Sequence, residues 1–310
     1  LAVSSVTFDS SVGEILWPAV TGHMVRLGDN SLPDLVDMAA DPARRLTHMQ
    51  CASTLLRLLV AEPDAAARIR AADTLFVGGE PFPLEVVPEL RTGDRGPRLI
   101  NAYGPTETTV WVSRCDVTPE TAEPVSIGAP SEGHVLRILD ERLGQVADGE
   151  PGMLWVSGPQ VATGYWDDPE LTAQAFMPVP SSDGAARMYR TGDIAKMTPA
   201  GIVIIGRSDD QVKIQGNRVE TGEVERALRA APGVRDAVCL VHRMPAGTTI
   251  LVGVCAGAGI DSKAVRGHLA AFLPGYMVPS RIVVRDSLPL TPASKVDRRR
   301  LISELGFNGG

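Results

Sequence analysis

The sequence predicts an α/β protein with two domains, because the pattern of its 310 residues changes twice along the chain. In residues 1–110, short apolar segments alternate with segments of helical periodicity, which indicates βαβ units and a parallel sheet. From 112 to 205, short strands between turns rich in glycine and proline favour a small β-barrel or sandwich. The rest is typical of a compact α+β module of about 100 residues, large enough for a domain of its own.

The elements of the first part follow from the apolar spacing. The chain begins inside what looks like a strand, which predicts that it is part of a longer protein. The helices have apolar residues three or four positions apart, and they are expected at 15–20, from 33, at 53–60 and from 83 to about 91. The strands are short and apolar, and they are expected at 46–51, 74–77 and 98–103.

The later elements are predicted in the same way. In the second part, strands are expected at 136–139 and 153–156. In the last module, Thr221 is expected to cap a helix that runs from about 222 to 230. The elements that follow it are strands and one helix, and they are expected at 237–242, 249–255, 262–272 (the helix) and 280–284.

Composition and charge exclude several classes of protein. The chain is 44% hydrophobic and 22% charged, with a mean hydropathy of +0.04, as in a soluble globular protein. A net charge of −7 and a pI near 5.3 argue against a nucleic-acid partner. No apolar stretch reaches the roughly 18 residues that cross a bilayer, so no membrane contact is expected. The four cysteines are far apart without metal-binding spacing, which predicts reduced thiols and a cytoplasmic location.

Residues 206–220 carry six charged side chains and several turn formers around few apolar residues. A packed core does not need this pattern, so we expect a mobile loop that contacts a polar ligand. Residues 101–108, NAYGPTET, end a predicted strand, where ligands of open α/β sheets bind. There Tyr103 offers a flat face for a base, Thr106 a hydroxyl for phosphate, and Glu107 a carboxylate suited to Mg²⁺.

Two further segments carry chemistry. Residues 189–193, YRTGD, are expected to end a strand in an acidic turn, and Asp193 either caps that turn or grips two ribose hydroxyls. Near the C-terminus, Lys295 follows a proline turn in LPLTPASKVDR. A mobile ammonium there could offset the repulsion between a carboxylate and an α-phosphate.

In their order, these motifs resemble those of the amino-acid adenylation domains of nonribosomal peptide synthetases, in the adenylate-forming superfamily. The chain reads FDSS, NAYGPTET, YRTGD, GRSDDQVKIQGNRVE and LPLTPASKVDR where that family has its motifs. It departs from the family at Met153, Thr163, Ile204, Gln215, Val219 and Ala293-Ser294. Residues 152–176 resemble the family too and are expected to be structural. The glycine-rich phosphate loop is not among the 310 residues, so the resemblance implies a partial large adenylate-forming domain and a small α+β C-terminal domain.

The resemblance implies ATP and Mg²⁺ as cofactors, with Glu107 holding the metal. Tyr103 would stack near adenine, Asn101 would contact its amino edge, and Asp193 would bind the ribose. The full nucleotide set is Asn101, Ala102, Tyr103, Gly104, Thr106, Asp193 and Arg207.

The resemblance also implies two half-reactions. Lys295, aided by Thr106, would promote formation of the aminoacyl-adenylate and pyrophosphate. Residues 209–310 would then swing about Asp209 relative to residues 1–208, bringing Lys213 inward while the acyl group passes to the phosphopantetheine thiol of a carrier protein. A small activator protein is a further partner that the family allows.

In the implied substrate pocket, Asp9 and Lys295 hold the two ends of the amino acid backbone. The walls carry no acid or base, which favours a small or neutral polar amino acid. Ser10, Gly13 and Gly78 are expected to leave room, and Trp111 to occupy it near the pocket floor. Gln50, as the amide among them, is expected to hydrogen-bond the substrate. The walls consist of Ser10, Gly13, Gln50, Phe76, Gly78, Ala102, Val110 and Trp111.

Two alternatives stay open at this point. An acyl- or aryl-CoA ligase would use coenzyme A as the acceptor, although Asp9 argues against it. A non-catalytic fragment that binds a nucleotide or a partner is the second alternative, because the phosphate loop is absent from the sequence.

Overall fold

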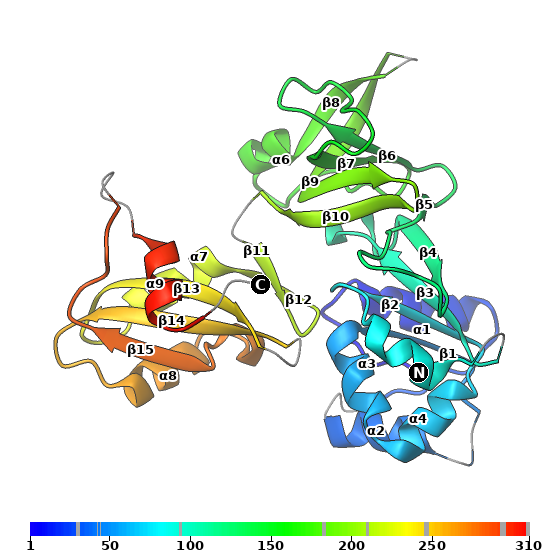
Figure 1. The fold of residues 1–310 in the computed structure, drawn as a ribbon, viewed down its shortest axis with the longest axis horizontal. Coiled ribbons are helices and arrows are strands. Elements are labelled where there is room, and N and C mark those ends of the chain that lie inside the picture. Colours follow the sequence, from blue (N-terminus) through cyan, green and yellow to red (C-terminus); the bar gives the residue numbers. More distant parts are fainter. Residues whose placement is uncertain are drawn as a thin grey trace. The chain divides into compact units, whose positions relative to one another are not determined.

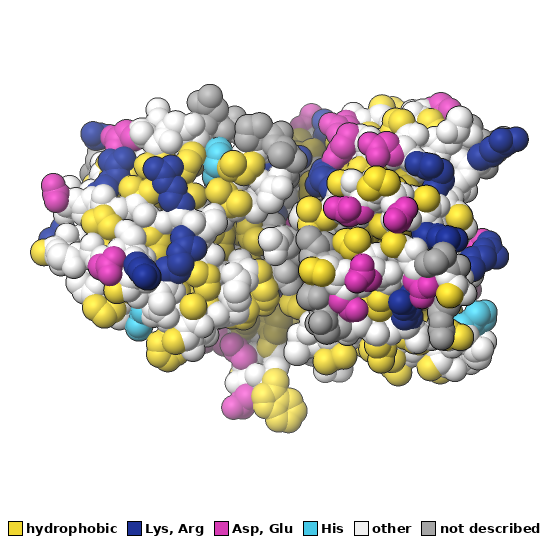
Figure 2. Space-filling view, turned by 90° about the horizontal axis from the view of Figure 1, so that it is seen from below, with side chains coloured by type: hydrophobic (Ala, Val, Ile, Leu, Met, Phe, Trp, Pro, Cys, Tyr) yellow, Lys and Arg dark blue, Asp and Glu magenta, His cyan; other side chains and the backbone are white. Residues whose placement is uncertain are grey.

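A computed structural model describes residues 1–28, 32–41, 43, 45–92, 95–181, 184–208, 211–244, 248–291 and 296–307. The chain divides into two compact units, Leu1–Asp209 and Asp210–Gly310 (Figure 1). Among the described residues, none of the helices has both the length and the apolar character that a membrane span requires. On the face in Figure 2, acidic and basic side chains are interspersed among apolar ones.

The first unit begins with a mixed sheet. Strands β1 (His48–Ala52), β2 (Thr74–Gly78) and β3 (Arg98–Tyr103) run parallel, which confirms the predicted βαβ units. Strands β4 (Ser113–Val117) and β5 (Ala129–Pro130) extend the sheet in antiparallel fashion. The reversal follows from the short connection after β3, since a parallel return needs a crossover of a dozen or more residues.

Helices cover the side of this sheet that holds most of its core. They are α2 (Leu32–Ala40), α3 (Ser53–Val60), α4 (Pro63–Arg70) and α5 (Val87–Leu90), the last preceded by a 3₁₀ turn, η1 (Leu84–Val86). Their apolar residues pack with Met49, Leu75 and Leu99 of the strands. Helix α4 was not predicted, because its alanines and arginines give a weak apolar stripe.

The remaining helix, α1 (Ser10–Val20), contacts the other face of the sheet. Its existence confirms the predicted helix. The strand expected at the start of the chain was wrong: residues 1–9 form only an isolated bridge, between Ala2 and Leu27.

The second sheet of this unit is antiparallel, with the strand order β10-β9-β7-β6 and β8 beside β9. Its elements are β6 (Val135–Leu139), β7 (Gly152–Ser157), β8 (Phe176–Ser181), β9 (Gly184–Thr198), β10 (Gly201–Arg207) and the helix α6 (Pro169–Ala175). The expected strands at 136–139 and 153–156 are confirmed. Asp193 lies within β9, so the expected turn at this residue was wrong. Tyr103, at the end of β3, packs into the core of this second sheet.

The second unit has a three-layered arrangement around β13 (Val234–Arg243), β14 (Thr249–Gly257) and β15 (Arg281–Arg285). Alternate residues of β13 pack toward α7 (Thr221–Arg229) and α8 (Ser262–Ala270) on one face, and toward α9 (Arg298–Glu304) on the other. The predicted α+β module is confirmed. Glu220 rather than Thr221 is the N-cap residue of α7, and Thr221 is the first, buried residue of the helix.

The charged segment 206–220 is largely a hairpin, not the expected loop. Strands β11 (Gln211–Ile214) and β12 (Asn217–Glu220) pair in antiparallel fashion. Gln215 and Gly216 between them both have positive φ, at 51° and 79°, as a two-residue hairpin turn requires. Ile214 and Val219 point into the core of the second unit, which accounts for the few apolar residues in the segment. Asp209, the predicted hinge, lies outside the described residues.

Candidate active site

Tyr103, Asp193 and Arg207 meet although they are far apart in the sequence. The Tyr103 hydroxyl donates to Asp193 Oδ2 at 2.6 Å, and Arg207 Nη1 donates to Asp193 Oδ1 at 2.6 Å. Burial and the neighbouring carboxylate raise the pKa of Tyr103 well above its ordinary value, so the phenol stays a neutral donor. The structure thus joins three residues that the motifs placed at one nucleotide site.

The strand register explains this meeting. Arg207 lies directly opposite Asp193 in the β10–β9 pair, which places the two side chains on the same face. The hydroxyl of Thr191 donates to the Leu154 carbonyl at 2.8 Å, tying β9 to β7. Arg207 Nη2 also donates to the Thr191 carbonyl at 3.2 Å. Asp193 is therefore held on a continuous sheet, not on a loop.

The other predicted nucleotide residues lie at the end of β3. Asn101 and Ala102 are buried in that strand, and Asn101 Nδ2 donates to the Ser126 carbonyl at 2.8 Å. Gly104 follows, and a Cβ there would lie 2.2 Å from the Val110 carbonyl oxygen, so the close backbone approach requires glycine. Thr106 is exposed at the start of the 3₁₀ turn η2 (Thr106–Thr108).

Glu107, the predicted metal ligand, is buried within η2. Tyr165 donates its hydroxyl to Glu107 Oε1 at 2.7 Å. The Ala162 amide donates to the Glu107 backbone carbonyl at 2.8 Å. Among the described residues, no cluster of three or more acidic, histidine or cysteine side chains could hold a metal ion. A single carboxylate still suits Mg²⁺, which is often bound by one or two carboxylates together with substrate phosphates.

Tyr165 is a contact that the sequence did not reveal. It lies in the segment 152–176, which was expected to be structural, and no spacing rule relates it to Glu107.

The backbone after η2 is strained. Thr109 and Val110 are consecutive β-branched residues with φ of 59° and 66°. Such residues rarely adopt positive φ, and strain of this kind concentrates at functional sites. Gln160 holds Thr109 through two hydrogen bonds. The Gln160 backbone carbonyl accepts from Thr109 Oγ1 at 2.8 Å, and the Gln160 side chain donates to the Thr109 carbonyl at 3.0 Å. Trp111 follows Val110 directly, so this strained backbone sets the direction of the Trp111 indole.

The predicted pocket residues of the first sheet share one face. Gln50 is paired with Phe76, and Gly78 with Ala102, in the parallel registers of β1–β2 and β2–β3. These residues alternate with the ones that pack toward α2–α5. Their face is the one that α1 contacts, since the Trp17 ring lies edge-on to Phe76 at 6.3 Å.

Helix α1, β1 and the strained loop meet at Gln50. Its Nε2 donates to the Ser10 carbonyl at 3.1 Å, and its Oε1 accepts from Trp111 Nε1 at 2.7 Å. A Cβ at Gly13 would lie 3.5 Å from the same oxygen. Gln50 was predicted to hydrogen-bond the substrate, and in the structure its amide contacts the pocket walls themselves.

The indole of Trp111 occupies the space beside Gly78. A Cβ at Gly78 would lie 2.6 Å from the ring and 2.3 Å from the Ala102 carbonyl oxygen. Both distances are too short for a side chain. The room that Gly78 was expected to leave is therefore filled by Trp111. Asp9 lies at the N-cap position of α1 and makes no side-chain capping bond.

In the second unit, Lys213 lies on β11 opposite Arg218. Lys295 is outside the described residues, but the chain on both sides of it is held. Val296 forms a bridge with Leu290, and the Asp297 amide donates to the Pro289 carbonyl at 2.8 Å.

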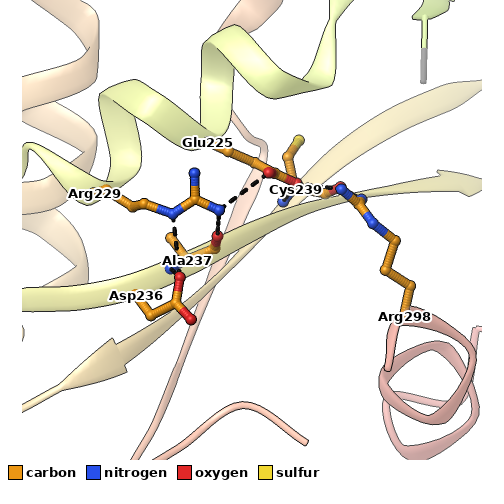
Figure 3. Close-up of polar contacts among 6 residues, drawn as sticks. All are labelled: Glu225, Arg229, Asp236, Ala237, Cys239 and Arg298. Atoms are coloured by element: carbon orange, nitrogen blue, oxygen red, sulfur yellow. Dashed lines mark hydrogen bonds and ion pairs between the residues drawn. The ribbon is translucent and has the colours of Figure 1, made fainter. Parts of the chain in front are cut away.

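Arg298 anchors this segment to the rest of the unit (Figure 3). It donates to Glu225 Oε1 at 2.6 Å and to the Cys239 carbonyl at 2.8 Å. Glu225 also accepts from the Cys239 amide at 3.0 Å and from Arg229 at 3.2 Å. This cluster joins α7, β13 and α9.

The comparisons with known proteins agree with this geometry. Residues 1–166 match the family described as AMP-binding enzyme, and residues 223–295 match the AMP-binding enzyme C-terminal domain. The chain belongs to the AMP-binding enzyme family. The resemblance seen in the motifs is thereby confirmed.

Relatives of the AMP-binding enzyme family resemble nearly the whole chain. It is 38% identical to chondramide synthase cmdD of Chondromyces crocatus over 97% of its length, but covers 8% of that protein. It is 37% identical to novobiocin biosynthesis protein H of Streptomyces niveus over 97% of its length, and covers 52% of it.

A solved structure is also similar. NpsA-ThdA, an artificially fused adenylation-PCP di-domain NRPS from Klebsiella oxytoca, matches with a TM-score of 0.81 and 26% identity, over 91% of this chain and 53% of that one. The chain thus spans about half or less of the length of each of these AMP-binding relatives.

Proposed function

We propose that the protein activates an amino acid with ATP to the aminoacyl-adenylate, releasing pyrophosphate, and passes the acyl group to the phosphopantetheine thiol of a carrier protein. It would thus be an adenylating ligase of nonribosomal peptide synthesis, a secondary metabolic pathway that makes compounds such as antibiotics. The observation that carries this proposal is the bonded group of Tyr103, Asp193 and Arg207 in a chain of the AMP-binding enzyme family.

This group has the chemistry that a ribose needs. An ionised carboxylate offers roughly four acceptor directions. Tyr103 and Arg207 each donate to a different oxygen of Asp193, which leaves acceptor capacity for the two ribose hydroxyls. Arg207 also places a positive charge near the phosphates. The predicted contacts of adenine with Tyr103 and Asn101 remain part of the proposal.

The phosphate end lies at η2. Thr106 would donate its hydroxyl to the α-phosphate, and Glu107 would hold Mg²⁺ on the buried carboxylate that Tyr165 orients. Bound there, Mg²⁺ would neutralise phosphate charge as pyrophosphate leaves.

The amino acid would lie against the face of the first sheet that α1 contacts. Asp9 would pair with the α-ammonium, while Lys295 would bridge the carboxylate and the α-phosphate. The pocket walls favour a small side chain, because the indole of Trp111 already covers Gly78. We further propose that movement about Asp209 withdraws Lys295 after adenylation and brings Lys213 inward for the thioester step.

A carrier-protein partner is supported by the relatives. NpsA-ThdA is described as an artificially fused adenylation-PCP di-domain NRPS, so a similar chain has been joined to a carrier domain.

An exchange assay tests the proposal. The complete protein that carries this chain is incubated with ATP, Mg²⁺, labelled pyrophosphate and one compound at a time from a panel of amino acids, fatty acids and aryl acids. We expect label to enter ATP with a small amino acid and not with the other acids. Exchange supported only by a fatty or aryl acid would favour a CoA ligase. The absence of exchange with any acid would favour a non-catalytic protein.

A further inference from the structure

Glu14 is a buried carboxylate in the middle of α1, with a relative exposure of 7%. Its Oε2 accepts from the backbone amides of Val3 at 2.8 Å and Ser4 at 2.9 Å. Its Oε1 accepts from the Ser4 hydroxyl at 2.7 Å. One side chain of α1 therefore fixes the backbone and the hydroxyl of the segment that precedes Asp9.

These bonds continue to the pocket. The Ser10 hydroxyl donates to the Ser4 hydroxyl at 2.9 Å, and the Ser10 carbonyl accepts from Gln50. Gln50 in turn accepts from the indole of Trp111. A series of contacts thus runs from Glu14 to the ring that covers Gly78.

The donors and acceptors of the series can point in only one way. An ionised carboxylate only accepts, so the Ser4 hydroxyl must donate to Glu14 and is left to accept from Ser10. The Ser10 carbonyl also only accepts, so Gln50 must present its NH₂ group to α1. Its oxygen then faces the indole N–H, which only donates. Glu14 thus orients the hydroxyls of Ser4 and Ser10, the Ser10 carbonyl orients Gln50, and Ser10 itself joins these two parts of the series.

Burying the carboxylate of Glu14 costs free energy of desolvation. Burial outweighs the hydrogen bonds and raises the pKa of Glu14, so the charged form is less favourable here than in water. An apolar residue at this position would avoid that desolvation. What the carboxylate adds is direction, because it fixes three donors at once.

We propose that Glu14 is a positioning residue for the amino-acid pocket, which it shapes through Ser4, Ser10 and Gln50 by fixing the indole of Trp111 against Gly78. This inference rests on the proposed function and assigns the small size of the accepted side chain to the hydrogen-bond series.

Exchange kinetics of the complete protein test this role. In Glu14→Gln, the KM for the preferred amino acid should rise about tenfold, because a neutral amide replaces charge-assisted bonds that orient Ser4. The KM for ATP should stay within about twofold, since the nucleotide site at Asp193 lies on other strands. Across glycine, alanine, serine, cysteine, valine, leucine and phenylalanine, the larger substrates should lose less than the preferred one.

Gln50→Leu interrupts the series without touching Glu14. As in Glu14→Gln, the larger amino acids should lose less activity than the preferred one, because the indole of Trp111 loses its acceptor. The double variant Glu14→Gln/Gln50→Leu should rank substrates as Gln50→Leu does, since residues that act through one path are not additive. Asp140→Asn is the matched control: one oxygen of Asp140 also accepts two backbone amides, in a turn after β6. It should leave both KM values and the ranking unchanged.

Two results would overturn the inference. One is an equal rise in the KM for amino acid and ATP in Glu14→Gln, which would indicate a general loss of structure. The other is an unchanged ranking in Gln50→Leu. In both cases the wild-type protein still exchanges pyrophosphate, so the proposed function survives. Loss of that wild-type exchange would instead remove the proposed function.

Discussion

The two units each bury a glutamate at 7% exposure, and the two side chains are satisfied differently. In the first unit, Glu14 accepts from neutral groups: two backbone amides and a hydroxyl. In the second, Glu225 accepts from two guanidinium groups, of Arg298 and Arg229, and from one amide (Figure 3).

The difference teaches what each carboxylate is suited to do. Two carboxylates balance the two guanidinium groups around Glu225, because Arg229 also pairs with Asp236. The partners of Glu225 come from β13, α7 and α9, so the cluster holds these elements together. Around Glu14 the donors are uncharged and local to one edge of the pocket. A carboxylate among neutral donors stabilises less, but it sets the direction of each donor.

The largest effect is expected for Glu225→Ala. The variant removes a buried carboxylate and leaves the guanidinium groups of Arg298 and Arg229 without it. Since those side chains are 36% and 41% exposed, we expect a loss toward the lower end of the about 3–5 kcal/mol that breaking a fully buried pair costs. Hydrogen exchange followed by mass spectrometry should show lost protection in β13 and α9, while β1 and β2 keep theirs. Equal losses in both units would contradict the local role of the cluster.

For Glu14→Ala we expect a smaller loss, about 2–3 kcal/mol. The amides of Val3 and Ser4 would lose their acceptor, and each unsatisfied buried donor costs about 1–3 kcal/mol before water replaces part of it. Protection should fall in α1 and β1. A loss that exceeds that of Glu225→Ala would reverse the comparison.

The pH dependence of stability should report on Glu14. Since the pKa of Glu14 is raised from its ordinary value of 4.5, the folded state holds its proton to higher pH than the unfolded state. The contribution of Glu14 to the free energy of unfolding should therefore fall as pH rises from 4.5 through the raised value.

Urea unfolding of the wild type and of Glu14→Gln, measured from pH 4.5 upward, gives the contribution of Glu14 as the difference between the two free energies of unfolding. The Cys51 thiol is electrostatically coupled to Glu14, and its own pKa is raised mainly by burial. A difference that grows with pH would show that the sign is wrong.

The smallest effect is expected for Glu304→Gln. Glu304 pairs with Arg285 and Arg300 on the surface of α9, at a side-chain exposure of 33%. Exposed pairs contribute little to stability, because water and salt screen them. The variant is thus a control for Glu225→Ala in the same unit, and a loss of stability as large as that of Glu225→Ala would contradict this expectation.

The local sequence pattern predicted most elements of the fold. It failed where contacts with residues far away in the sequence determine whether a segment forms a strand. Strand β3 and helix α3 were placed correctly, because their apolar spacing is strong. At the start of the chain, where a strand was expected, the described residues offer Ala2 only Leu27 as a bridge partner. The charged segment 206–220 became a hairpin because Ile214 and Val219 are buried by the second unit.

Prediction of the candidate site from the sequence is limited in the same way, by contacts between residues far apart in the chain. The motifs placed Asp193 and Arg207 together, and strand register brings them into contact. They could not reveal that Gln50 contacts Trp111, since that bond spans 61 positions. Glu14 left one signal, an acid inside a helix whose other residues are uncharged, but its partners depend on how the preceding segment folds back.

The contact between Gly78 and Trp111 confines changes in the size of the proposed pocket at this wall to position 111. Replacing the indole with a smaller side chain would widen the pocket in one mutational step. A side chain added at Gly78 would still meet the Ala102 carbonyl oxygen at 2.3 Å, whatever stands at position 111. Descendants of this protein can therefore gain larger substrates at this wall, whereas a return to smaller ones must come through position 111 again.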